Sequence, residues 1–167
     1  MGTKRVGMAR IKSLINENIN QLKFKTPEIL ALSTTRLLLA SESGATIYWT
    51  LGTTHHITLP DATVGLTYDF VIETGATNLH TIITQSSDKI HGSAFLMTAG
   101  TADQCNSQVV EDGAGLDKVH WKSDGTATGG GAGNTCKLTC VEAGKWVATV
   151  HATTSGTVAA TITILAN

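Results

Sequence analysis

The 167-residue chain has few charged and few aromatic residues. Charged side chains make up 15% of it and aromatic side chains 5%, whereas about a quarter of a typical globular domain is charged. No apolar run approaches the ~20 residues that a membrane-spanning helix requires. No apolar segment of the signal-peptide type follows a basic N-terminus either. We therefore expect a soluble protein of the cytoplasm with no membrane partner.

Cysteine is scarce as well, with only Cys105, Cys136 and Cys140 in the chain. If Cys136 and Cys140 share a strand, their Cα atoms lie ~13 Å apart at about 3.3 Å per residue. A disulfide needs a Cα separation below ~7 Å. We therefore predict that both are reduced and fill core positions beside Leu138 as small apolar groups, as expected in a reducing cytosol.

Motifs that carry chemistry are missing from the sequence. It contains no phosphate-binding loop, dinucleotide fingerprint, calcium loop or G-x-S-x-G elbow. Glu111 and Asp112 are adjacent carboxylates, but they lie in a glycine-rich turn. His55 and His56 point to opposite faces if they lie on a strand, and the other histidines are scattered. We expect no enzyme activity, cofactor or metal site. One alternative stays open, a metal site formed by histidines of several subunits on a symmetry axis.

Alternating apolar and polar residues dominate the rest of the chain, together with 17 glycines. Between Ala45 and Gly92, four short runs alternate with a period of two, which is typical of half-buried antiparallel strands. Over residues 36–167 this pattern predicts an all-β body, an antiparallel sandwich or barrel of about nine to eleven short strands. The predicted core framework consists of Trp49, Leu59, Tyr68, Phe70, Ile82, Trp121 and Trp146.

Other segments of the body carry more local predictions. Leu37–Leu39 is apolar and too short for a helix, so we expect a buried strand there. Residues 135–142 and 145–151 face each other across Ala143 and Gly144, which predicts a tight hairpin. Residues 107–110 and 118–122 flank either a hairpin or a longer excursion. The glycine-rich segment 123–134 lacks the spacing of a phosphate-binding loop and is interpreted as an exposed loop.

Residues 1–35 form a separate unit, a basic arm and a connector interrupted by Pro27. From about Gly7 to Leu22, apolar residues recur every three or four positions, which predicts an amphipathic helix. At this length such a helix is marginal alone in water and needs a surface for its apolar stripe. It can fold back on its own sheet, or pack against copies of itself or another protein.

Charge is distributed unevenly along the chain. Residues 1–36 contain seven Lys or Arg against Glu17 and Glu28, a balance of +5, and the remainder contains five Lys against eleven acidic residues, a balance of −6. A basic arm on an acidic body is expected to seek an acidic surface. Nucleic acid and an acidic protein shell both qualify, but the arm lacks interleaved aromatic residues. Direct nucleic-acid binding is therefore not expected.

Several segments together resemble a group of viral structural proteins. The opening MGTKRVG-x-AR, ahead of an amphipathic helix, is similar to the start of small proteins of marine tailed phages, cyanophages especially. The similar segments of the body are SGATIYWT, HHITLP, G-x-x-Y-x-F-V-I, ITQSSDKIHG and LTCVEAGKWVA. Within this group the chain is most similar to head decoration, or cement, proteins.

The resemblance implies a virion protein on the outer capsid surface, made in the host cytoplasm, that bridges major capsid subunits and assembles as a homotrimer. The arm residues expected to bind the capsid are basic (Lys4, Arg5, Arg10 and Lys12) or apolar (Ile11, Leu14, Ile15 and Ile19). An alternative is a tail-fibre or appendage module whose loops at 98–117 and 123–134 bind a host surface ligand.

Overall fold

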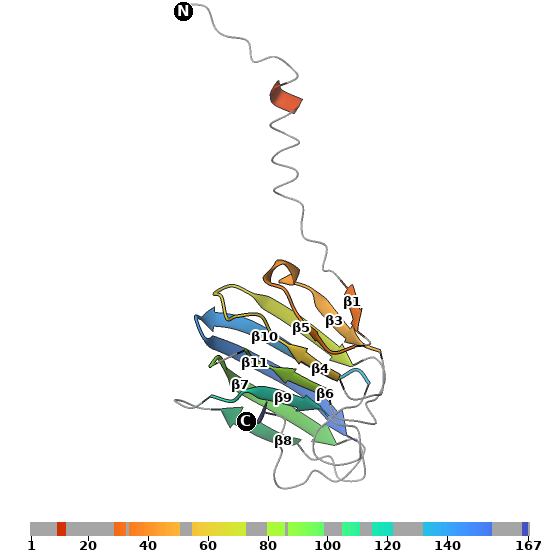
Figure 1. Cartoon of the computed structure of the whole chain (residues 1–167). Coiled ribbons are helices and arrows are strands. Elements are labelled where there is room, and N and C mark those ends of the chain that lie inside the picture. Colours follow the sequence, from red (N-terminus) through yellow and green to blue (C-terminus); the bar gives the residue numbers. More distant parts are fainter. Residues whose placement is uncertain are drawn as a thin grey trace, which may run out of the picture.

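The structure is a computed structural model of the whole chain (Figure 1). It describes residues 10–12, 29–32, 34–50, 55–72, 80–85, 87–98, 105–110, 115–121, 132–154 and 165–166. These residues form a mostly β structure with two sheets, one short 3-10 helix, η1 (Ala40–Glu42), and a helical turn at residues 10–12.

Both sheets are mixed, and neither closes into a barrel among the described strands. The larger sheet has the order β1 (Ile29–Leu32), β3 (Thr46–Trp49), β5 (Thr67–Ile72), β10 (Thr135–Glu142), β11 (Lys145–Thr154), β7 (Lys89–Thr98) and β8 (Cys105–Val110). The smaller sheet has the order β12 (Leu165–Ala166), β9 (Lys118–Trp121), β6 (His80–Ile83), β4 (His55–Thr58) and β2 (Arg36–Leu37).

In the first half of the body, successive strands alternate between the two sheets, so that each pair of strands makes one turn of a solenoid. Strands β1, β3 and β5 are parallel neighbours in the larger sheet. Strands β2, β4 and β6 are parallel neighbours in the smaller sheet. Each strand of one sheet is followed by a strand of the other, which is the connectivity of a short β-solenoid.

The predicted antiparallel pairing was therefore wrong for this half of the body. The alternation of apolar residues was correct, since β5 alternates between half-buried and buried positions along its length. The connections 50–54, 59–66 and 73–79 are longer than the two-residue turns of the commonest hairpins. Each connection instead leads from a strand of one sheet to a strand of the other. The new strand then pairs with the previous strand of its own sheet, as β5 does with β3 and β6 with β4.

The predicted hairpin between β10 and β11 is confirmed, and it occupies the centre of the larger sheet. Cys136 pairs with Val150 and Cys140 with Trp146, and the turn contains Gly144 at φ +77°. Strand β10 pairs antiparallel with β5, while β11 pairs parallel with β7. The hairpin thus lies between the parallel strands β1, β3 and β5 on one side and β7 and β8 on the other.

Residues 107–110 and 118–121 do not form a hairpin with each other. Strand β8 pairs with β7 in the larger sheet, and β9 pairs with β6 and β12 in the smaller one. The hairpin alternative is therefore wrong, because β8 and β9 belong to different sheets.

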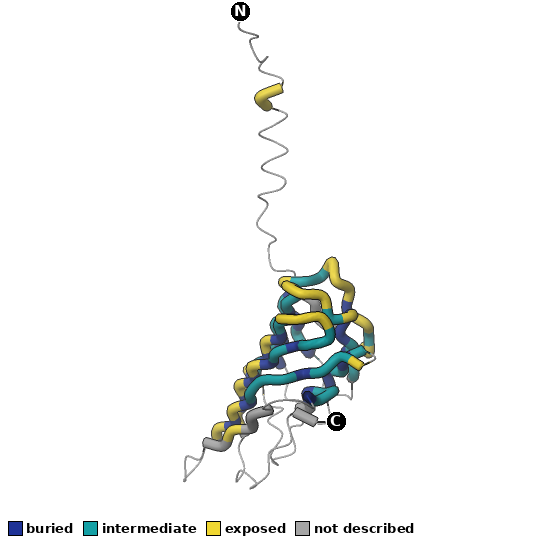
Figure 2. Tube along the Cα trace, turned by 90° about the vertical axis from the view of Figure 1, so that its left-hand side faces the viewer, coloured by how far each residue is buried: buried dark blue, intermediate teal, exposed yellow. Residues whose placement is uncertain are grey.

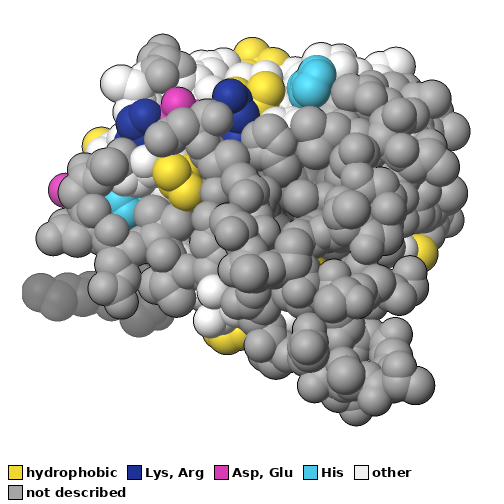
Figure 3. All heavy atoms as spheres, turned by 90° about the horizontal axis from the view of Figure 1, so that it is seen from below, with side chains coloured by type: hydrophobic (Ala, Val, Ile, Leu, Met, Phe, Trp, Pro, Cys, Tyr) yellow, Lys and Arg dark blue, Asp and Glu magenta, His cyan; other side chains and the backbone are white. Residues whose placement is uncertain are grey.

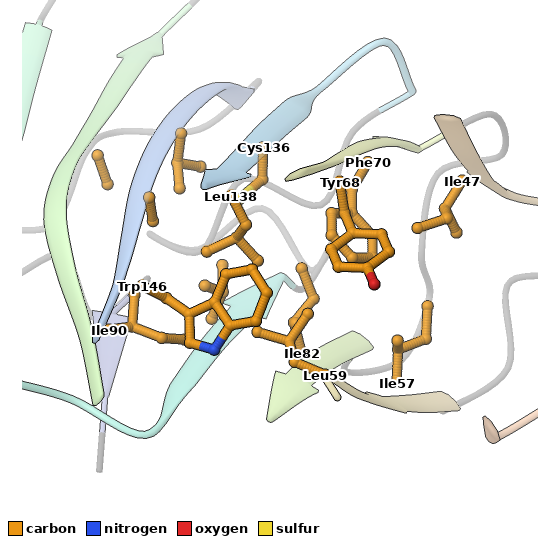
Figure 4. Close-up of a cluster of buried hydrophobic side chains, with 14 of the residues drawn as sticks. Ile47, Ile57, Leu59, Tyr68, Phe70, Ile82, Ile90, Cys136, Leu138 and Trp146 are labelled. Carbon is orange, nitrogen blue, oxygen red and sulfur yellow. The ribbon is translucent and has the colours of Figure 1, made fainter. Parts of the chain in front are cut away.

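One hydrophobic core is shared by both sheets (Figure 4). Phe70, Leu138 and Trp146 come from the larger sheet, and Ile57 and Ile82 from the smaller one. Six residues of the predicted framework, Trp49, Leu59, Tyr68, Phe70, Ile82 and Trp146, have no exposed surface. The seventh, Trp121, lies in β9, and its side chain is outside the described part of the structure.

The expected buried strand at Leu37–Leu39 is not present as such. Leu38 is fully buried, but Leu37 is 45% exposed and Leu39 is 54% exposed. Strand β2 ends at Leu37, and η1 begins directly afterwards at Ala40. Residues 38–45 connect β2 of the smaller sheet to β3 of the larger sheet, so this segment is a connection between sheets rather than a central strand.

Candidate functional site

The N-terminal arm is described only at Arg10, Ile11 and Lys12. These three residues form a helical turn, as predicted, and all of them are exposed. Ile11, which belongs to the predicted apolar stripe, is 41% exposed. The other predicted capsid-binding residues, Lys4, Arg5, Leu14, Ile15 and Ile19, lie outside the described residues.

The described turn of the arm does not pack on the β body. Figures 1 and 2 show it standing clear of both sheets from two directions. An exposed isoleucine between two exposed cations is an apolar contact point with charge on either side. Ile11 therefore presents part of its apolar side chain to solvent.

The chain first joins the body at β1, which pairs with β3, and side-chain contacts between β2 and η1 hold the next segment. Arg36 forms an ion pair with Glu42, whose other carboxylate oxygen accepts a hydrogen bond from the Leu39 backbone N–H at 2.8 Å. The Tyr68 hydroxyl donates to the Leu39 carbonyl at 2.9 Å. Burial raises the pKa of Tyr68 to about 12, and the nearby Glu42 carboxylate adds to this effect. These contacts tie the segment that follows the arm to a core strand.

The two cysteines of β10 are free and buried, as predicted from their spacing. Burial raises the pKa of the Cys136 thiol far above its ordinary value, and the charge of Asp69 raises it further. Burial also raises the pKa of Cys140, with a smaller opposing effect from its hydrogen bond to the Glu142 carbonyl. A thiol held in its protonated form is a poor nucleophile, so neither cysteine is a candidate for catalysis.

Among the histidines, His80 has a structural position that the sequence did not reveal. It lies on β6, is fully buried, and stacks on Trp49 with ring centroids 4.8 Å apart and an interplanar angle of 6°. Trp49 belongs to the larger sheet and His80 to the smaller one, so the pair joins the two sheets. Within the described ranges, no group of three or more His, Cys, Asp or Glu side chains could hold a metal ion.

Charges of both signs lie among the described residues of the face seen in Figure 3. In Figure 3, basic and acidic side chains of described residues lie next to one another. Lys89 at the start of β7 forms an ion pair with Asp117. None of the helical residues in the described part of the chain forms a helix that is long and apolar enough to cross a membrane.

A groove that the sequence analysis missed crosses the outer face of the larger sheet. It has a volume of about 500 Å³ and is lined by residues of β3, β5, β10 and β11. The side chains that line it, such as Asp69 and Lys137, alternate with core residues along each strand. The only available sequence signal was therefore the outward half of the alternating pattern, which does not say which strands are neighbours.

Comparison with protein-family models, with curated proteins and with solved structures finds no match to this chain. Its function must therefore be argued from its own residues and geometry.

Proposed function

We propose that this protein decorates and stabilises the outer surface of a tailed-phage capsid, bridging neighbouring major capsid subunits. The observation that carries the proposal is the exposed helical turn at residues 10–12, where Ile11 is 41% exposed and makes no contact with the core. The +5 balance of residues 1–36 against −6 in the remainder supports an acidic partner surface for this turn.

In the proposed arrangement, the arm contacts the capsid shell and the body lies on the outside of the shell. In this proposal the body is a two-layer β-sandwich of the two mixed sheets, and three copies assemble as a homotrimer. Each arm lies along an adjoining capsid subunit, with its apolar stripe in a groove and Arg10 and Lys12 facing acidic groups. An arm that buries ~800 Å² binds weakly alone, but three linked arms bind firmly together.

Bridging of this kind stabilises a shell mechanically. A capsid under internal pressure opens only if contacts between neighbouring capsomers break, and each bridge adds a contact that must break with them. The pairing of β1 with β3 joins the chain that follows the arm to the larger sheet, so tension on the arm is passed to that sheet. The hydrogen bond from Tyr68 to Leu39 holds the next segment to the core.

Substitutions in the full-length chain test the proposal. Ile11→Asp and the double variant Arg10→Glu with Lys12→Glu are expected to fold normally, because these side chains are exposed. We expect each variant to bind empty capsid shells at least about tenfold more weakly, since buried apolar anchors and charge complementarity dominate such contacts. The measurement is co-sedimentation with shells assembled from the major capsid protein of the same phage.

The matched control is Lys137→Glu, which reverses an exposed charge on the body. It should bind shells as well as the unmodified protein does. Deletion of residues 1–22 should also leave the body folded, because every described residue of the hydrophobic core lies at Leu38 or beyond. Full shell binding by the deletion variant would overturn the proposal.

A further inference from the structure

The groove on the outer face of the larger sheet has a polar row at its centre. Asp69 of β5 is the register partner of Thr46 on β3 and of Lys137 on β10. Lys137 is in turn the partner of Thr149 on β11. Four neighbouring strands therefore present a hydroxyl, a carboxylate, an ammonium and a second hydroxyl side by side.

A second row, displaced by two residues on each strand, has a different character. Val71, Thr135 and His151 are register partners on β5, β10 and β11. Beyond them, Phe95 of β7 is the partner of His151, and the two rings stack with centroids 5.8 Å apart and an interplanar angle of 17°. Tyr48 of β3 is the partner of Val71 at the other end of the row. Aromatic rings thus lie at both ends of the row, and Phe95 is 39% exposed.

The charged groups of the groove are available for a ligand. Asp69 is half-buried and Lys137 is exposed, and neither makes a side-chain hydrogen bond or ion pair with any other described residue. One carboxylate beside one ammonium leaves the polar row without net charge. Such a lining does not attract a polyanion such as nucleic acid, which requires a cluster of cations.

The lining also differs from that of a protein-binding surface. Its hydroxyls, carboxylate and ammonium supply both donors and acceptors, while the large apolar groups are confined to the ends. A ligand that fits must be rich in hydroxyl groups, uncharged, and able to lay a flat apolar face on an aromatic ring. Sugars combine these properties, because their C–H faces are apolar and their edges carry hydroxyls.

The geometry points to a binding site for a neutral oligosaccharide that lies across β3, β5, β10 and β11. Asp69 and Lys137 hydrogen-bond the sugar hydroxyls, and the Phe95–His151 pair stacks against one sugar ring. Tyr48 and His151 are three strand spacings apart, or ~14 Å at 4.8 Å per strand, so the site spans more than one sugar unit. Its volume of about 500 Å³ lies within the usual range for ligand sites.

This site is independent of the arm and goes beyond capsid decoration. The arm residues proposed to bind the shell include none of the residues that line the groove. A sugar-binding face on the same molecule would let the particle adhere weakly to a glycan-coated surface. Many copies on one particle would then raise the overall affinity.

Calorimetric titration of the full-length protein with three neutral tetrasaccharides tests the inference. The probes are cellotetraose, maltotetraose and chitotetraose, which differ in linkage and substitution. We expect saturable binding of at least one of them with a Kd of about 1 mM or below. Asp69→Asn should weaken that binding about tenfold through loss of a charged acceptor. Phe95→Ala should weaken it about fivefold through loss of stacking.

Met97→Ala is the matched control, because Met97 is an exposed residue of the same strand but pairs with Thr153, whereas Phe95 stacks on His151 of the groove lining. It should bind the sugar normally, and all three variants should keep the unmodified melting temperature and bind capsid shells as before. Absence of binding to all three probes at ~10 mM would overturn the inference. So would equal binding by Asp69→Asn and the unmodified protein. A shift of Phe95→Ala to a smaller oligomer without sugar binding would instead identify this face as a contact between copies.

Discussion

Replacement of Gly92 by alanine tests the parallel pairing of β7 with β11. It should destabilise the protein strongly. Gly92 has φ +124°, and a Cβ added to it would lie 2.0 Å from the Ala148 carbonyl oxygen on β11. It would also lie 2.9 Å from the carbonyl carbon and the nitrogen of Ala148. These are backbone atoms of a strand that is paired on both sides, so they cannot move aside without breaking ladder hydrogen bonds.

The expected cost is the sum of two effects. A backbone conformation that only glycine adopts easily costs ~1–3 kcal/mol with alanine. Packing an extra group into a filled site adds ~1–3 kcal/mol. We therefore expect Gly92→Ala to lower the free energy of unfolding by about 2–6 kcal/mol.

Gly44→Ala is the matched control. Gly44 also has a positive φ, +87°, but a Cβ added there would meet no atom within 4 Å. Its cost should be the backbone effect alone, about 1–2 kcal/mol. The measurement is urea unfolding followed by tryptophan fluorescence, which reports on the buried Trp49 and Trp146. Equal losses in the two variants, or a loss below ~1 kcal/mol at Gly92, would contradict the β7–β11 register.

Two further predictions concern the core. Phe70→Ala should lower the free energy of unfolding by about 3–5 kcal/mol through lost burial and a cavity, measured by urea unfolding. Its shell binding should fall only as far as the protein unfolds, and a loss of binding by a fully folded variant would contradict a purely structural role. Tyr68 has a pKa raised from 10.0 to about 12, so its contribution to stability is complete below pH 10 and is lost as the pH rises through 12. Tyr68→Phe, which removes the hydrogen bond to Leu39, should show a smaller loss of stability over that pH interval in unfolding experiments; an unchanged pH dependence would contradict this assignment.

Local patterns in the sequence were sufficient for part of the fold. The alternation in residues 67–72 correctly predicted a strand with Tyr68, Phe70 and Ile72 on its buried face. The hairpin between β10 and β11 was also predictable, because its strands are joined by a two-residue turn with Gly144 at positive φ. The free state of Cys136 and Cys140 followed from their spacing on one strand. Burial periodicity and short turns are properties of neighbouring residues, so sequence alone reports them.

The direction and the partner of each strand were decided only by the tertiary structure. Strand β5 lies next to β3 and β10, and β7 lies next to β11 and β8, and none of these four pairs is joined by a two-residue turn. Backbone donors and acceptors are the same in every strand. An alternating sequence pattern therefore does not specify which other strand a given strand pairs with. The choice depends on how the connections cross between the sheets and on how side chains from both sheets fill one core.

The groove illustrates the same distinction at the level of function. Asp69 and Lys137 are far apart in the chain, and each looks like an ordinary solvated residue of its own strand. They become neighbours only because the β10–β11 hairpin inserts beside β5. The sequence by itself was sufficient to predict an alternating β body, and it also predicts a basic amphipathic arm ahead of that body. The tertiary structure decided which outward side chains share one surface, because strand pairing brings together residues that are distant along the chain.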